Sequence, residues 1–178
     1  MLINVLLPGF LLLMVLLLLY MTVTELITFI LTRVPFIPTS TADIEDLIVR
    51  LDIQPIDYVY DIGSGNGKVV FAVEDLAGAR VRGIQRAGWT QSYAKLKARL
   101  IGSKAELVSG NFFDHPWREA TVIYAYLYPF LMSQVGDKVM QDCEPGTKIV
   151  TRDFPIPNLA LADSWDTPSK HKIYLYIV

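Results

Sequence analysis

Three glycines alternate in the stretch DIGSGNGK, at Gly63, Gly65 and Gly67, directly after a run of β-branched and aromatic residues. Glycine adopts backbone conformations that other residues avoid, and it lets the main chain approach a ligand closely. The dinucleotide-binding pattern G-x-G-x-x-G requires a third glycine where Lys68 stands. The carboxylate of Asp61 would repel a pyrophosphate and attract an ammonium group. The loop therefore predicts a ligand with an amino group, and its spacing disfavours a nicotinamide-dependent oxidoreductase.

An acid followed by G-x-G-x-G resembles the first motif of class I S-adenosylmethionine-dependent methyltransferases. The resemblance implies that Gly63, Ser64, Gly65 and Gly67 wrap the methionine end of S-adenosylmethionine, and that Asp61 helps to hold its amino group. The alternative is a turn that only packs a helix against a strand.

Two further places in the chain are implied to contact the cofactor. Gln85 ends the second predicted strand, where the superfamily usually has an acid that binds both ribose hydroxyls. A neutral amide can accept one hydrogen bond and donate another, so cofactor affinity is expected to be weaker. Asn111 and Phe112 follow the third predicted strand, where the superfamily contacts the adenine. The alternative is an asparagine favoured in a turn and a phenylalanine in the core.

The aromatic stretch YAYLYPF, residues 124–130, is the candidate acceptor site. Superfamily members that methylate amines or amides often place a polar, aromatic loop after the fourth strand, and Tyr126, Tyr128 and Pro129 occupy it here. Aromatic rings attract a sulfonium and an incoming ammonium through cation–π interactions. The alternative is a tyrosine-rich strand that packs the core.

Other reactive residues are weaker candidates. Histidine is a common general base because its unperturbed pKa is near 6.5, which makes His115 a candidate; the alternative is a residue in a surface loop. Arg152 and Asp153 either orient the substrate or form a solvated charge pair. Cys143 is the only cysteine and receives no role. With one cysteine and two scattered histidines, no metal site is expected.

These residues need a framework, and the hydrophobic pattern from residue 57 onward supplies one. Strands are expected at 58–62, 80–84, 105–109, 120–126 and 147–152, with helices at about 68–76, 89–100 and 130–140. Such alternation predicts an α/β fold, a Rossmann-like class I methyltransferase sheet with helices on both faces. Residues 161–178 predict a C-terminal antiparallel hairpin, and no helix is expected before it.

The first part of the chain has a different character. Residues 5–24 carry no charge, and about 20 apolar residues suffice to cross a hydrocarbon core. One N-terminal transmembrane helix is expected; a signal peptide would need a basic n-region, and a buried or interfacial helix is the other alternative. Arg33 and Arg50 follow the span, which places the C-terminal domain on the cytoplasmic side or its organellar equivalent.

The expected organisation is a transmembrane anchor at 1–32, a proline-containing connector at 33–39 and one methyltransferase domain at 40–178. Ser40 or Thr41 caps a short helix at the start of that domain, and Ile44, Leu47 and Leu51 recur at helical spacing in it. The formal net charge of the chain is -2, so no nucleic-acid partner is expected.

Four strings together carry a narrower resemblance: VPFIPT, DIGSGNGKVV, YLYP, and PGTKIV followed by FPIP. In this order they resemble the family of single-span, membrane-anchored class I methyltransferases, whose eukaryotic members are similar to the ATP synthase c-subunit lysine methyltransferase. The resemblance implies methyl transfer to a lysine of a membrane protein. A methyltransferase for a lipid or small molecule stays open, as does a non-catalytic cofactor-binding module, which Gln85 mildly favours.

Overall fold

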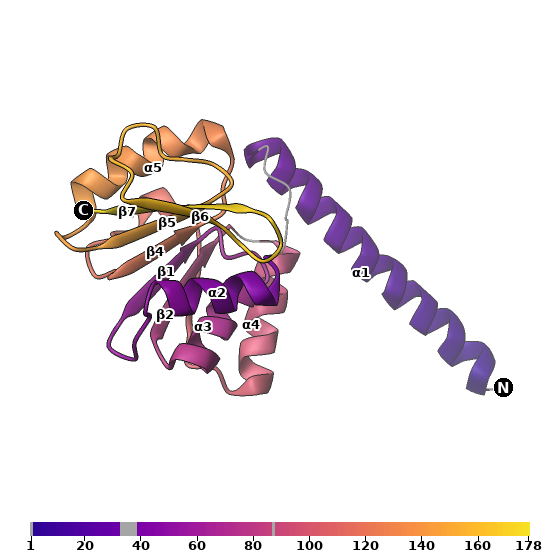
Figure 1. The fold of residues 1–178 in the computed structure, drawn as a ribbon. Coiled ribbons are helices and arrows are strands. Elements are labelled where there is room, and N and C mark those ends of the chain that lie inside the picture. The colour runs from indigo at the N-terminus through magenta and orange to yellow at the C-terminus, as the bar shows by residue number, and fades with distance from the viewer. Residues whose placement is uncertain (1, 33–38, 87) are drawn as a thin grey trace. The chain divides into compact units, whose positions relative to one another are not determined.

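A computed structural model describes residues 2–32, 39–86 and 88–178, and the chain divides into two compact units, Met1–Pro35 and Phe36–Val178 (Figure 1). The first unit holds helix α1 (Leu2–Thr32), with Pro8 inside it. Its segment Leu6–Thr24 is long and apolar enough to cross a membrane. The predicted connector lies, apart from Thr39, outside the described residues.

The second unit is built on a seven-stranded sheet with the order β3-β2-β1-β4-β5-β7-β6. The strands are β1 (Tyr58–Ile62), β2 (Arg80–Gln85), β3 (Glu106–Ser109), β4 (Val122–Ala125), β5 (Lys148–Arg152), β6 (Asp163–Asp166) and β7 (Lys172–Ile177). Strands β1 to β5 run parallel, while β7 is antiparallel to β5 and to β6. The predicted Rossmann-like sheet and its C-terminal hairpin are confirmed.

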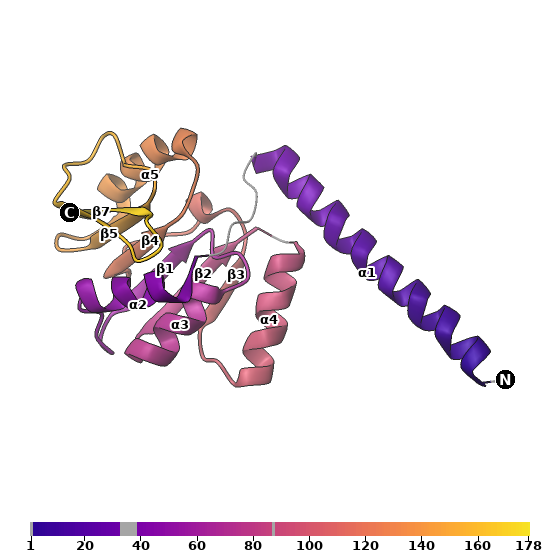
Figure 2. The same cartoon turned by 45° about the vertical axis from the view of Figure 1, so that its right-hand side comes forward.

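Helices cover both faces of this sheet, as Figures 1 and 2 show. They are α2 (Thr41–Arg50), α3 (Lys68–Ala77), α4 (Trp89–Ile101) and α5 (Pro129–Asp142), with a short 3-10 helix η1 (Phe112–Asp114). Apolar residues of α2 and α3 pack with Val59 and Val122 on one face, and those of α5 pack with Ile62 and Ile123 on the other. Each helix lies within about two residues of its expected bounds, because apolar spacing and glycine stops are local signals.

Strand β1 shows how the sheet places a charged residue inside the protein. All five of its residues are buried, and successive side chains point to opposite faces. Val59 and Asp61 therefore share the face that α2 and α3 cover. Because parallel strands are covered on both sides, the carboxylate of Asp61 reaches this interior at the carboxyl end of the strand.

A buried ion pair connects α2 to the end of the chain. Asp43 accepts hydrogen bonds from the backbone N–H of Ser169, at 3.0 Å, and from its hydroxyl, and an Arg152 Nη2 atom lies 3.0 Å from the same carboxylate. Arg152 is only 3% exposed, and Asp153 pairs instead with His171. The solvated Arg152–Asp153 pair considered from the sequence is therefore wrong, because Arg152 is buried and its guanidinium pairs with Asp43.

Candidate active site

The glycine loop joins β1 to α3 at the carboxyl edge of the sheet. Gly63, Gly65 and Gly67 have φ values of +92°, +53° and +78°, in the left-handed region that favours glycine. A Cβ atom on Gly63 would lie 2.9 Å from a Leu127 methyl group, and one on Gly67 would lie 2.7 Å from the Phe71 ring. The loop thus needs its glycines both for backbone conformation and for close packing.

Asp61 lies immediately before this loop and is 3% exposed. Burial raises the pKa of its carboxyl from 3.8 to about 7. Among the described residues, no hydrogen bond or ion pair to this carboxylate offsets the burial. A buried carboxylate is stabilised by a cation placed beside it, so the site fits the ammonium group of S-adenosylmethionine.

Gln85 lies at the carboxyl end of β2, beside the end of β1 in the sheet. Its Oε1 atom accepts a hydrogen bond of 3.3 Å from the backbone N–H of Gly65. The structure therefore brings Gln85 and the glycine loop together, although they are separate in the sequence. The buried Ser64 hydroxyl finds no hydrogen-bond partner within the described parts of the chain.

Asn111 and Phe112 follow β3 at the same edge. Asn111 begins η1: its Oδ1 accepts from the Phe113 N–H at 3.5 Å, and its Nδ2 donates to Asp114 at 3.2 Å. The Phe112 ring lies 6.4 Å from that of Trp117, whose indole N–H donates to the Phe112 carbonyl. These local structural roles are the ones considered as alternatives, and contact with adenine stays a prediction.

His115 lies close to the end of β3. A Cβ atom added to Gly110 would come within 2.8 Å of the His115 Nε2 atom, so the imidazole covers this glycine. Its ring is partly buried. A general-base role has no support from this position.

The candidate acceptor residues follow β4. The guanidinium of Arg152 lies 4.8 Å from the centre of the Tyr126 ring. Burial raises the pKa of Tyr126, and the carboxylate of Asp153 raises it further. Tyr128 is the N-cap of α5, and Pro129 occupies the first turn, where its missing N–H costs nothing.

One aromatic residue near this loop, Phe154, was missed from the sequence. The Tyr128 ring stacks on Phe154, with 6.3 Å between ring centres, and lies 6.2 Å from Phe130. Phe154 belongs to the string FPIP after β5, which was noted as part of a resemblance but received no role. The end of β4 and the segment after β5 therefore form one aromatic cluster.

A buried hydrogen bond was also missed. Tyr124 and Thr39 form a bond of 3.1 Å between their hydroxyls, which ties the start of the domain to β4. Burial raises the pKa of Tyr124, and the nearby Asp61 carboxylate contributes in the same direction. Asp61, Tyr124 and Arg152 thus belong to one polar region on the face covered by α2, and only long-range contacts reveal it.

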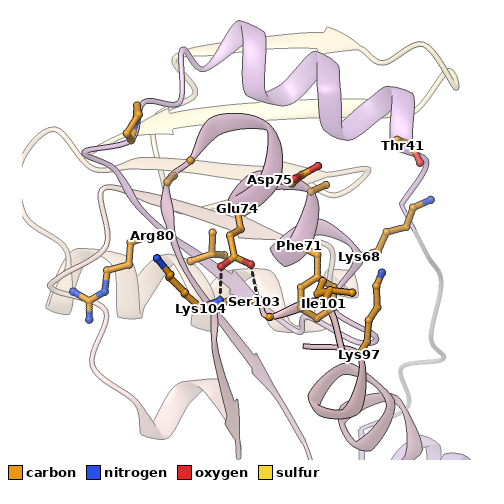
Figure 3. A pocket seen from close by; sticks show the side chains of 17 residues that line it. Thr41, Lys68, Phe71, Glu74, Asp75, Arg80, Lys97, Ile101, Ser103 and Lys104 are labelled. Atoms are coloured by element: carbon orange, nitrogen blue, oxygen red, sulfur yellow. Dashed lines mark hydrogen bonds between the residues drawn. The ribbon is translucent and has the colours of Figure 1, made fainter. Parts of the chain in front are cut away.

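A separate groove of about 890 Å³ runs between α3 and α4 (Figure 3). Phe71 and Ile101 line it, and the ammonium of Lys97 lies 4.8 Å from the centre of the Phe71 ring. Glu74 fixes the turn after α4 by accepting hydrogen bonds from the Ser103 hydroxyl and the Lys104 N–H. None of the candidate cofactor residues lines this groove.

The sheet order and a glycine loop beside a buried acid are those of a class I S-adenosylmethionine-dependent methyltransferase. Comparison with solved structures agrees. An RNA methyltransferase from Salinibacter ruber in complex with S-adenosyl-L-homocysteine superposes with a TM-score of 0.75 at 26% identity, over 80% of this chain and 94% of that chain. The protein is an enzyme of this class, and its cofactor is S-adenosylmethionine.

Sequence comparison gives the family. Residues 61–163 match the ANTKMT methyltransferase domain, so the chain belongs to this family. A protein-lysine N-methyltransferase of Saccharolobus islandicus is 26% identical over 153 residues, which cover 82% of this chain and 94% of that protein. The adenine nucleotide translocase lysine N-methyltransferase of Mus musculus is 24% identical over 127 residues, covering 70% of this chain and 55% of the mouse protein.

Proposed function

We propose that this enzyme methylates the side-chain amine of a lysine in a membrane protein, and that α1 anchors it in the same membrane. The observation that carries the proposal is the relative from Saccharolobus islandicus, which is named a protein-lysine N-methyltransferase and is matched over 94% of its length. Two mammalian relatives are named for adenine nucleotide translocase and for the ATP synthase c-subunit. An apolar helix such as α1 would bring the domain to acceptors in a membrane.

The cofactor is held by the residues at the carboxyl ends of β1 to β3. The Asp61 carboxylate pairs with its amino group, and the main chain of Gly63, Ser64, Gly65 and Gly67 encloses the methionine end. When bound, the cofactor supplies an electrophilic methyl group on a sulfonium centre.

Residues at the carboxyl ends of β2 and β3 would hold its nucleoside end. Gln85, whose Oε1 atom accepts a hydrogen bond from the Gly65 N–H, would hydrogen-bond the ribose. Asn111 and Phe112, at the start of η1, would lie beside the adenine.

The acceptor lysine enters beside Tyr126, Tyr128 and Pro129. The tyrosine rings attract its ammonium form and align the side chain, and Pro129 fixes the backbone that presents Tyr128. The amine must lose its proton before it can attack, and its ordinary pKa is about 10.4. Burial beside the Arg152 guanidinium lowers this pKa, so solvent water accepts the proton.

The remaining contribution of the chain is alignment. Holding an amine in line with a methyl group converts a bimolecular encounter into a reaction within one complex, which can lower the barrier by several kcal/mol. No metal-binding group of His, Cys, Asp and Glu occurs among the described residues.

The proposal also assigns the membrane anchor and the side of the membrane on which the domain lies. We assign residues 1–32 to the transmembrane anchor, 33–39 to the connector and 40–178 to the methyltransferase domain; the division of the chain into two compact units supports this. The basic residues Arg33 and Arg50 favour the cytoplasmic side, or its organellar equivalent, for the domain.

Methyl transfer from labelled S-adenosylmethionine into membranes that lack the enzyme tests the proposal. Products are separated into protein, lipid and RNA, and the modified side chain is identified by mass spectrometry. Methyl-lysine in an integral membrane protein is expected, and it must disappear with the Gly65→Val variant. Label confined to lipid or to RNA would overturn the lysine assignment.

A further inference from the structure

Helix α4 has an apolar stripe on the face that points away from the sheet. Its buried residues are Thr90, Gln91 and Ala94. Tyr93, Leu96 and Leu100 are 49%, 56% and 78% exposed, and their spacing of three and four residues puts them on one face. A surface helix normally presents polar residues opposite its buried side. This stripe is therefore a second apolar face with no covering partner among the described residues of its unit.

Positive charge borders the stripe on both sides. Lys95 and Arg99 lie along one border and Lys97 along the other, and α4 contains no acidic residue. Lys97 also lies over Phe71 at the adjoining groove, where Figure 3 shows the ammonium ends of Lys97 and Lys68 on the same side. An apolar stripe between rows of cations is typical of helices that lie on anionic membranes.

We propose that the exposed face of α4, made of Tyr93, Leu96 and Leu100 with Lys95, Lys97 and Arg99, lies on the anionic lipid surface of the membrane that holds α1. The apolar side chains enter the headgroup boundary, and the cations contact lipid phosphates. This inference rests on the membrane anchor of the proposed function. It adds a second contact that orients the domain on the membrane.

The charges of α4 argue for lipid over a second copy of the chain. In a symmetric dimer through this face, the three cations of one copy would meet the same three cations of the other. Like charges across an interface are costly, whereas an anionic lipid surface attracts each of them.

The length of the chain also favours membrane contact. Seven residue steps separate Thr32, the last residue of α1, from Thr39, and such a segment reaches at most about 25 Å. Helix α4 has 13 residues and is about 20 Å long. A domain tethered this closely has a high effective concentration at the lipid surface, so a weak contact is enough to orient it.

Depth measurements on the full chain in lipid nanodiscs test the inference. Cys143 is replaced by alanine, and an environment-sensitive fluorophore is attached after Leu100→Cys. With phosphatidylglycerol in the nanodisc, we expect blue-shifted emission and quenching by a spin label carried on the lipid. The matched control is Gln141→Cys, an exposed position on α5, where we expect neither effect.

Charge dependence gives the second measurement. Each basic residue near an anionic surface strengthens binding about fivefold, so Lys95→Gln with Arg99→Gln should weaken docking by about 25-fold. High salt should also weaken docking, and so should nanodiscs made of phosphatidylcholine alone. Equal quenching in both lipids would overturn the proposed lipid chemistry.

A fluorophore attached to the Leu13→Cys variant, in α1, distinguishes failure of this inference from failure of the membrane anchor. Quenching at Leu13 without quenching at Leu100 overturns the α4 contact and leaves the proposed function intact. Absence of quenching at both positions overturns the anchor and this inference together. A label at Leu100 that is shielded from lipid but cross-links to a second chain assigns the face to self-association instead.

Discussion

The two halves of the sheet build their candidate sites in different ways. In the cofactor half, β1 to β3, the site is mainly backbone: glycines at positive φ and a main-chain N–H that donates to Gln85. In the acceptor half, β4 to β7, side chains from distant segments meet, such as Tyr126, Arg152 and Asp43. Variants in the two halves should therefore fail differently.

The largest effect is expected in the cofactor half. Gly65→Val should abolish binding of S-adenosylmethionine, because a β-branched residue at φ +53° is strained and its side chain would enter the proposed cofactor site. Calorimetry measures binding, and circular dichroism checks the fold. Gly146→Val is the matched control, since Gly146 also has positive φ, at +91°, and no atom lies within 4 Å of an added Cβ. Near-normal binding by Gly65→Val would contradict the glycine-loop assignment.

The acceptor half should instead show a loss of stability. Asp43→Asn leaves the buried Arg152 guanidinium without its countercharge and should lower the free energy of unfolding by about 3 kcal/mol. Urea denaturation measures this change. The affinity for S-adenosylmethionine, measured under conditions where the variant is folded, should stay within a few-fold of the original value.

The exposed residue Glu119 provides the control for this experiment. It lies 3.8 Å from Arg82 with a largely exposed side chain, so Glu119→Gln should change stability by less than about 1 kcal/mol. Equal losses in the two variants would mean that burial of the Asp43–Arg152 pair is not what matters.

The pH dependence of cofactor binding gives a further test of the cofactor half. Burial raises the pKa of Asp61 to about 7, and only its ionised form pairs with an ammonium group. Affinity for S-adenosylmethionine should therefore rise about tenfold per pH unit as the pH approaches about 7, and level off above it. Calorimetry across this range measures it, and Asp61→Asn should bind weakly and without this pH dependence. A flat profile in the original protein would separate Asp61 from the amino group.

The same pKa has a consequence for stability of the free protein, with the opposite direction. The carboxyl is neutral more readily in the folded state than in the unfolded state, whose pKa is near the ordinary 3.8. The free energy of unfolding should therefore fall as the pH rises from about 4 to about 7. The Asp61→Asn variant should lack this contribution to the pH dependence.

The smallest effect is expected at Gln85. Gln85→Glu supplies a charged acceptor to the ribose and should tighten S-adenosylmethionine by on the order of 1 kcal/mol. Gln141→Glu adds the same charge on exposed α5 and should leave affinity unchanged. Unchanged or weaker binding by Gln85→Glu would show that this side chain does not face the ribose.

The elements and the glycine loop were predictable because their signals lie within short stretches. A β-branched run before three glycines identifies β1 and its loop, and apolar spacing with a following glycine identifies α3 and α4. The absence of a helix between β5 and β6 in the described chain also agrees with prediction. Individual roles of Asp61, Gln85 and Tyr126 stay predictions.

Contacts between distant segments were not predictable from pattern alone. Arg152 and Asp153 are adjacent in sequence, yet one is buried against Asp43 and the other pairs with His171. Phe154 joins Tyr128 only because β5 lies beside β4 in the sheet. The stripe on α4 was missed for a different reason: its apolar residues fitted a helix, but only the structure shows which face the sheet covers.

The contact between Asp43 and Ser169 also orders events during synthesis of the protein. The two residues are 126 positions apart, and Ser169 lies near the end of the chain. While the ribosome is still translating, α1 and the glycine loop have already emerged, but the Asp43 carboxylate has no partner from the last strands. This hydrogen bond can form only after Ser169 has left the ribosome. The apolar helix α1 therefore leaves the ribosome before the contact between Asp43 and Ser169 can form.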